Sequence, residues 1–432
     1  MSRENHASAP IVVVGAGAAG LMAVIAAATA RGAGPERDRR HVVLLEGTER
    51  LGTKILMSGG TRCNVTHDFV EAADYFGGSR NVVARLLREF SHEDARKFFE
   101  EELHVALKRE ETGKLFPVTD DAVTVRDALV RRAEEVGVEI LLGRKVTAIE
   151  RMADARGSGN GPRFRLVALP HSIEARSVIL TTGGLSLPRT GSDGTGYAIA
   201  RSLGHGFTAT TPALTPLVAR GDLHTRLKGV TLPVELTVRA NGRRVWRGAG
   251  SFLFTHFGYS GPVALDASRH FVRAPIEGGS PAAVIASFLP GESPEALDTA
   301  LASGESGESG RTLAGWLRGR VPESVARELL TEVGVPGDRM LARLPREERR
   351  AVVRVLTEFE LPVLEVMGYR KAEVTAGGVP LSEVEPSTLE SRIVPGLYLA
   401  GEILDVDGRL GGYNFQWAWT TGWVAGRGAT KS

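Results

Sequence analysis

The sequence contains a single cysteine, Cys63, among its 432 residues. An intrachain disulfide, a paired-cysteine redox centre and a cysteine-rich metal site are therefore excluded, and we predict no bound metal. A chain without disulfides suits a reducing compartment, so we expect a cytoplasmic protein.

The sequence also lacks an excess of charge of either sign. Lys and Arg total 53 while Asp and Glu total 51, which leaves a formal net charge of +2. This balance gives no electrostatic reason to expect nucleic acid or a membrane as the main partner. Neither a signal peptide nor a membrane span is expected, because residues 1–10 are polar and glycines interrupt the apolar stretch 11–30. No Ser/His/Asp, zinc or P-loop pattern is apparent in the sequence.

Glycine, by contrast, is abundant, with 52 residues that often fall in clusters. The first cluster, 15–20 (GAGAAG), lies between an apolar β-branched run at 11–14 and an Ala-rich stretch at 21–28. A second apolar run, 42–45, ends in Glu46. A GxGxxG turn between a strand and a helix, with an acidic residue after the next strand, is the dinucleotide-binding fingerprint.

Each residue of this turn has a physical role in that interpretation. Gly15 permits the tight turn, Gly17 lets the backbone approach a pyrophosphate, and Gly20 lets the helix pack closely on the sheet. Ala18 and Ala19 lie where the helix begins, so their N–H groups are free for phosphate oxygens.

Glu46 can accept hydrogen bonds from a ribose diol, and its charge disfavours a 2′-phosphate. The alternative is a closely packed turn between strand and helix, with Glu46 merely solvated.

A second glycine-rich stretch, 52–67, has no regular periodicity and is either a cofactor-binding loop or an ordinary surface loop. Lys54 and Arg62 are candidate cations for a phosphate or an anionic ring, and Asn64 is a candidate amide. Cys63 is either redox-active or, as we favour, a small side chain packed beneath the loop.

This stretch resembles the G-x-K-I-x-x-S-G-G-G-R-C-N-x-T-N signature of the bacterial YhiN-like or BaiN-like flavoproteins. This family, also called the aminoacetone-oxidase family, is of the glutathione-reductase and fumarate-reductase type. The matching positions are Gly52, Lys54, Ile55, Ser58, Gly59, Gly60, Arg62, Cys63, Asn64 and Thr66. Thr61 replaces a glycine of the signature, which puts a Cβ near the presumed flavin, and His67 replaces an asparagine.

The resemblance extends over essentially the whole chain and implies FAD as the cofactor. It implies that backbone at Val146 contacts the adenine, and that residues 181–184 form the second FAD motif. It implies that Glu402 holds the ribityl or pyrophosphate end, and that Gly412 opens a helix beside the flavin. The remaining cofactor residues implied by these motifs are Thr182, Gly183, Gly401, Tyr413 and Asn414.

We expect an α/β fold in which a discontinuous Rossmann-like FAD-binding domain (1–195 and 372–432) carries two insertions. The first is an antiparallel β domain (196–308 with 361–371), where Asn241-Gly242 between alternating runs predicts a hairpin. The second is a small helical subdomain (309–360). Its basic segment 343–354 is either a solvated helical face, which we favour, or a nucleic-acid contact.

The predicted function is hydride transfer between flavin N5 and an unidentified small organic substrate, held between the flavin domain and the inserted β domain. A second dinucleotide fingerprint is missing, so NADH or NADPH would be a transient donor. Pocket residues could include His256, Tyr259 and Arg409, and no catalytic residue is assigned. The alternatives are an RNA-modifying flavoprotein, which a basic patch on the inserted domain would favour, and a non-catalytic flavin or redox sensor.

Overall fold

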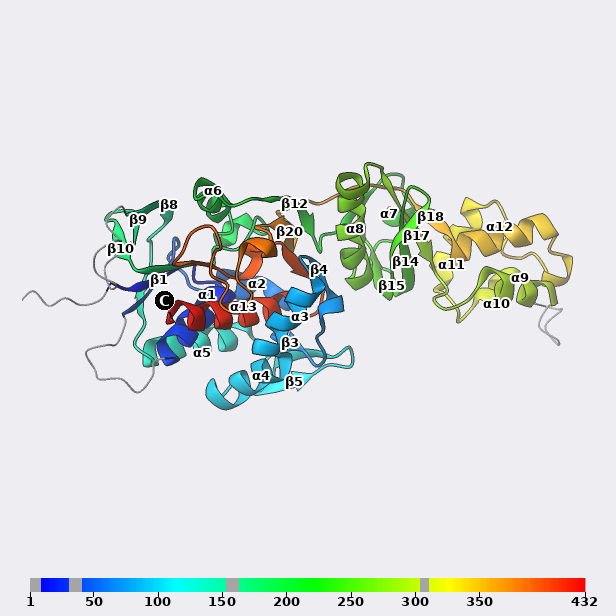
Figure 1. Ribbon diagram of the computed structural model, residues 1–432. Coiled ribbons are helices and arrows are strands. Elements are labelled where there is room, and N and C mark those ends of the chain that lie inside the picture. The colour runs from blue at the N-terminus through cyan, green and yellow to red at the C-terminus, as the bar shows by residue number, and fades with distance from the viewer. Residues whose placement is uncertain (1–8, 31–40, 153–162, 304–310, 432) are drawn as a thin grey trace, which may run out of the picture. The chain divides into compact units, whose positions relative to one another are not determined.

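The computed structural model describes residues 9–30, 41–152, 163–303 and 311–431. The chain divides into two compact units, Met1–Thr210 with Glu373–Ser432, and Thr211–Ala372 (Figure 1). We expected the first stretch of the FAD-binding domain to end at 195, but the first unit continues to 210. The reason is that α6 (Thr195–Ser202) packs Tyr197 and Ile199 into the core of the first unit.

The first unit is built on a five-stranded parallel sheet in the order β21-β11-β1-β2-β7. The strands are β1 (Ile11–Val14), β2 (Val42–Leu45), β7 (Glu139–Leu141), β11 (Ser177–Leu180) and β21 (Leu397–Leu399). Every residue of β1 and β2 is buried, as expected for strands covered on both faces. Because β21 comes from the C-terminal segment, the domain is discontinuous, as predicted.

Two long helices, α1 (Ala18–Thr29) and α13 (Tyr413–Ala429), lie side by side against this sheet (Figure 1). Glycines on α13 permit their close approach. A Cβ at Gly422 would lie 2.4 Å from the Ala19 carbonyl oxygen, and one at Gly426 would lie 2.3 Å from that of Ala23. The C-terminal helix α13 therefore packs directly against α1, the helix that follows the first glycine turn.

Smaller elements complete the first unit. The other helices are α2 (Thr53–Met57), α3 (Arg80–Glu89), α4 (His92–Lys97) and α5 (Ala122–Glu135). Single helical turns occur at η2 (Ser58–Thr61), η3 (Ala72–Asp74), η4 (Phe98–Glu102), η5 (Pro188–Thr190), η7 (Leu381–Glu383) and η8 (Gly401–Ile403). One three-stranded sheet contains β3 (Thr66–His67), β6 (Lys114–Pro117) and β5 (Leu107–Arg109), and another contains β10 (Ile173–Ala175), β9 (Phe164–Ala168) and β8 (Val146–Arg151). Strand pairs are β22 (Val406–Gly408) with β4 (Tyr75–Gly77), and β12 (Thr208–Ala213) with β20 (Val374–Gly378).

The second unit contains a seven-stranded antiparallel sheet in the order β18-β17-β14-β15-β16-β13-β19. The strands are β13 (Leu217–Ala219), β14 (Thr231–Ala240), β15 (Arg243–Phe254), β16 (Gly258–Ser260), β17 (Ala282–Ser287), β18 (Phe359–Leu361) and β19 (Val363–Val366). The predicted hairpin is present, with Asn241 (φ 52°) and Gly242 (φ 70°) both in the left-handed region that such turns require.

The helices of the second unit are α7 (Leu223–Arg226), α8 (Pro262–Gly278), α9 (Pro294–Ser303), α10 (Leu313–Leu317), α11 (Glu323–Glu332), η6 (Leu341–Arg343) and α12 (Arg346–Thr357). We expected 309–360 to form a subdomain of its own. Instead its apolar residues, such as Trp316 and Leu356, share one hydrophobic core with Val234 and Phe252 of the sheet. No helix in the described ranges combines the length and apolar character needed to cross a membrane.

Candidate functional site

The turn between β1 and α1 has the geometry of a phosphate-binding loop. Gly15 adopts φ 101°, which L side chains rarely adopt, and its N–H donates to the Leu45 carbonyl (2.8 Å). A Cβ at Gly20 would lie 1.9 Å from the Gly15 oxygen, so only glycine fits there. At Gly17, in contrast, nothing lies within 4 Å of the added Cβ, so this side of the loop is open to a ligand. The N–H groups at the start of α1, from Ala18 and Ala19, follow directly.

Glu46 follows β2 and faces this loop. Its Oε2 accepts from the Ala16 N–H (2.9 Å) and its Oε1 accepts from the Thr48 N–H (2.8 Å). A Cβ at Gly191 would lie 3.9 Å from Oε1. The carboxylate is thus anchored beside the loop rather than merely solvated.

The residues after β11 contact the same loop. The Thr181 hydroxyl lies 2.9 Å from the Val14 carbonyl and 2.8 Å from that of Gly15. Thr182 Oγ1 is buried and has no hydrogen-bond partner among the described residues. Gly183 adopts φ 71°. The two predicted FAD motifs are therefore adjacent, whereas Thr182 Oγ1 faces α6, because a Cβ at Gly196 would lie 1.8 Å from it.

Val146 begins β8, the outer strand of its three-stranded sheet, and its side chain is buried. The preceding residue, Lys145, pairs with Asp193 (2.6 Å) and lies against Gly47, next to Glu46. The strand edge that we assigned to the adenine is accordingly near the Glu46 end of the site.

The signature loop contains a run of left-handed backbone, at Gly59 (φ 55°), Gly60 (φ 67°), Thr61 (φ 70°) and Cys63 (φ 60°). A Cβ at Gly59 would lie 3.0 Å from the Asn64 nitrogen, whereas nothing lies within 4 Å of one at Gly60. Gly60 therefore resembles Gly17, because both leave room for a ligand beside the main chain.

Thr61 occupies a backbone conformation that is unfavourable for a β-branched residue. Its hydroxyl donates to the Gly60 carbonyl (2.6 Å), and the residue is exposed. The glycine of the family signature is thus explained by the positive φ. The substitution in this chain places local strain at the loop.

Cys63 is fully buried, and burial raises the pKa of its thiol to about 12, although a hydrogen bond with Ser58 acts in the opposite direction. A thiol that stays protonated is a poor nucleophile. The structure therefore supports the packing interpretation over the redox one.

The end of the signature loop contacts the start of α13. A Cβ at Gly412 would lie 2.9 Å from Asn64 Oδ1, which is buried and has no hydrogen-bond partner among the described residues. The Tyr413 ring stacks on His67 at 5.0 Å. The side-chain amide of Asn414 bonds the Gly408 N–H and carbonyl (2.8 and 2.9 Å) and braces that turn.

Arg62, the other candidate cation beside Lys54, has acidic partners in the first unit. Its guanidinium contacts Glu110 (2.8 Å) and Asp120 (3.5 Å) and lies over the Phe116 ring at 4.0 Å. The hydrogen bond to Glu110 raises the pKa of Arg62, so the group is charged but already paired.

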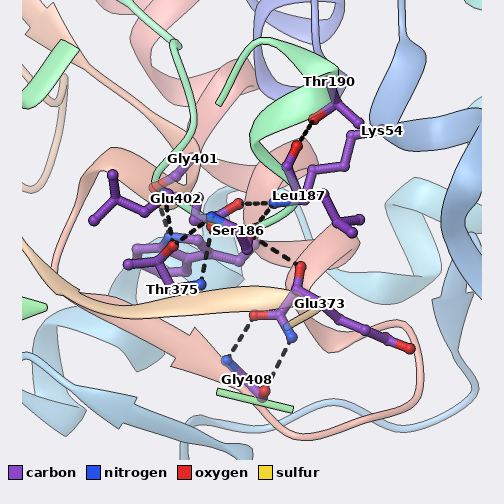
Figure 2. Close-up of polar contacts among 12 residues, drawn as sticks. Lys54, Ser186, Leu187, Thr190, Glu373, Thr375, Gly401, Glu402 and Gly408 are labelled. Carbon is purple, nitrogen blue, oxygen red and sulfur yellow. Dashed lines mark hydrogen bonds and ion pairs between the residues drawn. The ribbon is translucent and has the colours of Figure 1, made fainter. Parts of the chain in front are cut away.

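A polar network joins four distant segments of the first unit at Lys54 and Glu402 (Figure 2). The Lys54 ammonium forms an ion pair with the Glu402 carboxylate and donates to Ser186 Oγ (2.5 Å). Glu402 Oε1 also accepts from Ser186 Oγ (2.6 Å) and from the Thr375 N–H (2.9 Å). Glu402 therefore holds Lys54 and two backbone segments in place.

Sequence reasoning did not identify Ser186 and Thr375. Thr375 Oγ1 accepts from the N–H groups of Leu185 (2.8 Å) and Ser186 (3.1 Å), which fixes the chain beyond the second FAD motif. The only available signal was their position beside predicted glycine clusters.

The three tentative pocket residues have different environments. Tyr259 is fully buried in the core of the second unit, so its assignment to a substrate pocket was wrong. Arg409 pairs with Asp74 (2.9 Å) and lies 5.4 Å from the Tyr413 ring, and His256 is exposed.

One arrangement was not expected from the sequence. His205 lies between Glu383 (2.7 Å) and Ser391 Oγ (2.9 Å), which is the order of a Ser/His/acid triad. Ser391 is buried, and its Oγ also accepts from the N–H groups of Ile393 and Val394 (3.1 and 2.8 Å). These contacts fix a turn and leave no approach for a substrate.

Comparison with known proteins identifies the family of this chain. A family model described as the HI0933-like protein Rossmann domain matches residues 9–428. The chain is 32% identical over 424 residues to the 3-dehydro-bile acid delta(4,6)-reductase of Clostridium scindens, covering 98% of this chain and 99% of that enzyme. It is also 32% identical over 416 residues to the ribosomal RNA dihydrouridine synthase of Escherichia coli, covering 96% of each.

Among solved structures, an open-conformation flavocytochrome c3 fumarate reductase superposes with a TM-score of 0.47 at 17% identity, covering 99% of this chain and 78% of that chain. The family match and the two full-length relatives confirm the resemblance predicted from the sequence. The chain belongs to the HI0933-like (YhiN-like or BaiN-like) family of FAD-dependent flavoprotein oxidoreductases.

Proposed function

We propose that this chain is a reductase that uses FAD to add hydride to a carbon–carbon double bond conjugated with a carbonyl group. The observation that carries the proposal is the shared chemistry in the names of its two full-length relatives, a delta(4,6)-reductase of 3-dehydro-bile acids and a dihydrouridine synthase. A 3-oxo ring with neighbouring double bonds and a uracil ring both contain a conjugated C=C–C=O group. One hydride-transfer reaction therefore serves both kinds of substrate.

The residues of the site fit FAD. Open space beside Gly17 and Gly60 permits close approach of the main chain to a ligand. The buried oxygen Asn64 Oδ1 lacks a partner among the described residues, and a bound polar group would satisfy it. Bound FAD supplies the hydride chemistry, which the protein itself does not contain.

In this proposal the adenosine end lies near Val146 and Glu46, and the pyrophosphate lies on the N–H groups of residues 15–20. The flavin end lies near Gly60, Asn64 and the start of α13. The positive end of the α13 dipole, at Gly412, would favour negative charge there.

NADH or NADPH is proposed as a transient donor. The described ranges contain one strand–GxGxxG–helix unit, at β1 and α1, and FAD is assigned to it. A nicotinamide would therefore visit the flavin without a domain of its own.

The donor side is tested by mixing the purified, FAD-loaded protein anaerobically with NADH or NADPH and following the visible flavin absorbance. We expect bleaching by at least one of the two. A protein that cannot take up FAD would contradict the proposal, and bound FAD that no donor reduces would support the sensor alternative.

Two classes of substrate fit this reaction, a small conjugated ketone and a uracil base in RNA. The near-neutral charge of the whole chain argued for the small molecule. The distribution of arginines in the second unit is the specific observation that favours RNA.

A further inference from the structure

We propose that the second unit binds the phosphate backbone of RNA through a surface formed by Arg239, Arg244, Arg346, Arg350 and Arg354, named here the arginine surface. The inference rests on the proposed function and names its substrate class, a base carried in RNA.

The helix α12 supplies three of these arginines. Arg346, Arg350 and Arg354 recur every four residues and so lie along one side of the helix. All three are exposed, and none forms a hydrogen bond or ion pair within the described part of the chain. They span about 12 Å of helix axis, which is long enough to reach several successive phosphates.

Positive charge exceeds negative charge on α12, which contains four arginines and two glutamates. The hydrogen bond from Arg349 (2.8 Å), together with the charges of Arg349, Arg350 and Arg346, lowers the pKa of the Asp298 carboxyl despite partial desolvation. Arg349 is neutralised by its contact with Asp298, whereas Arg346 and Arg350 form no hydrogen bond or ion pair within the described ranges and are available to a polyanion.

The sheet supplies the rest of the surface. On β14, even-numbered residues such as Val238 are buried, while Glu235, Thr237 and Arg239 project from the opposite face. This face contains a hollow of about 350 Å³, which is also lined by Arg244 and Arg247. Thr357 and Glu358, at the end of α12, line the same hollow and connect the helix to the sheet.

Of the acidic residues on or beside the surface, Glu347 of α12 is exposed and has no partner among the described residues, whereas the others are neutralised. Glu235 pairs with Arg247 (2.8 Å), Glu358 lies 3.9 Å from Arg239, and Glu292 pairs with Arg320 (3.2 Å). Arg244 has no such partner within the described ranges, as is also true of the three arginines on α12. The balance is positive because the unpaired groups on the surface are mainly arginines.

The chemistry of the surface fits RNA better than a membrane. A helix that lies on a membrane exposes apolar side chains, whereas Val352, Val353, Val355 and Leu356 of α12 all face the protein core. The residues lining the hollow include no aromatic side chain on which a base could stack. We therefore expect contact with phosphates, which binds without reading the sequence.

The test measures binding of the full-length, FAD-loaded protein to a fluorescent uridine-containing RNA hairpin by anisotropy, over a range of salt concentrations. The test variant is R346Q/R350Q/R354Q. The matched control is R80Q/R85Q/R88Q, which removes the same charge from exposed, unpaired arginines of α3 in the first unit. The charge-preserving variant R346K/R350K/R354K completes the set.

We expect the test variant to bind about tenfold or more weakly, with a log–log salt slope that is shallower by about 2 to 3. The control and the lysine variant should stay close to wild type, and flavin absorbance and its bleaching by NAD(P)H should not change. Equal losses in the test and control variants, or no RNA binding by the wild type, would overturn the inference. The reductase proposal would still stand if the flavin were reduced normally, and it would fail separately if FAD were not bound.

Discussion

Lys54 and Glu402 form an ion pair although 348 positions separate them in the sequence. Lys54 belongs to the signature loop, and Glu402 lies in the turn that follows the last strand of the parallel sheet. Ser186 and Thr375 meet the same carboxylate, so it joins the loop to both later FAD motifs (Figure 2). The pair is one of the contacts that join the two halves of the discontinuous domain, together with the pairing of β21 with β11 and the packing of α13 on α1.

We expect K54M and E402Q each to weaken FAD binding about ten- to hundredfold, because removing either charge leaves the other without its partner. The double variant should be little worse than either single variant, since both remove one interaction. Fluorescence quenching of added FAD measures the dissociation constants. The surface pair Arg96–Glu100 provides a control, and R96Q should bind FAD normally. Fully additive losses at 54 and 402 would show that the two side chains act independently.

The glycines of the first loop allow a matched comparison. G17A should lower the free energy of unfolding of the apoprotein by less than about 1 kcal/mol, because its Cβ enters open space. The same variant should lose FAD affinity at least about tenfold, because that space is assigned to the pyrophosphate. G20A should instead destabilise the apoprotein by about 2 kcal/mol or more, because its Cβ meets the Gly15 oxygen. Denaturant unfolding and FAD titration separate the two effects, and normal FAD affinity in G17A would contradict the assignment of the loop.

Thr61 provides a test of local strain. T61G should raise the free energy of unfolding by about 1 kcal/mol, because glycine adopts φ 70° without the steric cost of a β-branched side chain. The measurement is chemical denaturation of the apoprotein beside wild type. A loss of stability in T61G would mean that the Thr61 hydroxyl bond to Gly60 outweighs the strain.

The raised pKa of Cys63 predicts that the stability of the folded protein falls as the pH rises above about 9. Burial raises its pKa from 9.0 to about 12 in the folded protein, so the unfolded chain loses its proton first as pH rises. Its contribution to stability is complete below about pH 9 and declines as the pH approaches 12.

The native Cys63 thiol should also resist iodoacetamide at pH 8 and react after unfolding in guanidinium. C63A should bind FAD and bleach with the donor as wild type does; rapid alkylation of the native protein would support a redox role instead.

The parts of this protein that the sequence predicts are those with a local pattern. Residues 11–46 contain strand, turn, helix and acidic residue in fixed order, and the structure reproduces each of them. The partners of Arg62 could not be anticipated, because Glu110 and Asp120 are brought to it by tertiary folding and have no motif of their own. The same holds for Ser186 and Thr375, which are common residue types at long separation from Glu402.

Burial of single residues was equally hard to predict. Tyr259 was named as a residue that the substrate pocket could include, yet it lies on a short strand, β16, and is buried in the core. The boundary at 210 rather than 195 depends on how α6 packs, and the merging of 309–360 with the sheet depends on one shared core. Such features follow from tertiary contacts, which local sequence patterns do not reveal.

The central claim, that this flavoprotein reduces a conjugated double bond, is tested most directly on the acceptor side. The FAD-loaded protein would be reduced anaerobically and mixed separately with a 3-oxo-4,6-diene steroid and with a uridine-containing RNA. We expect at least one of them to restore the oxidised flavin spectrum and to gain two hydrogens in mass, and the arginine surface favours the RNA. A reduced flavin that neither compound reoxidises, but that oxygen reoxidises readily, would contradict the claim.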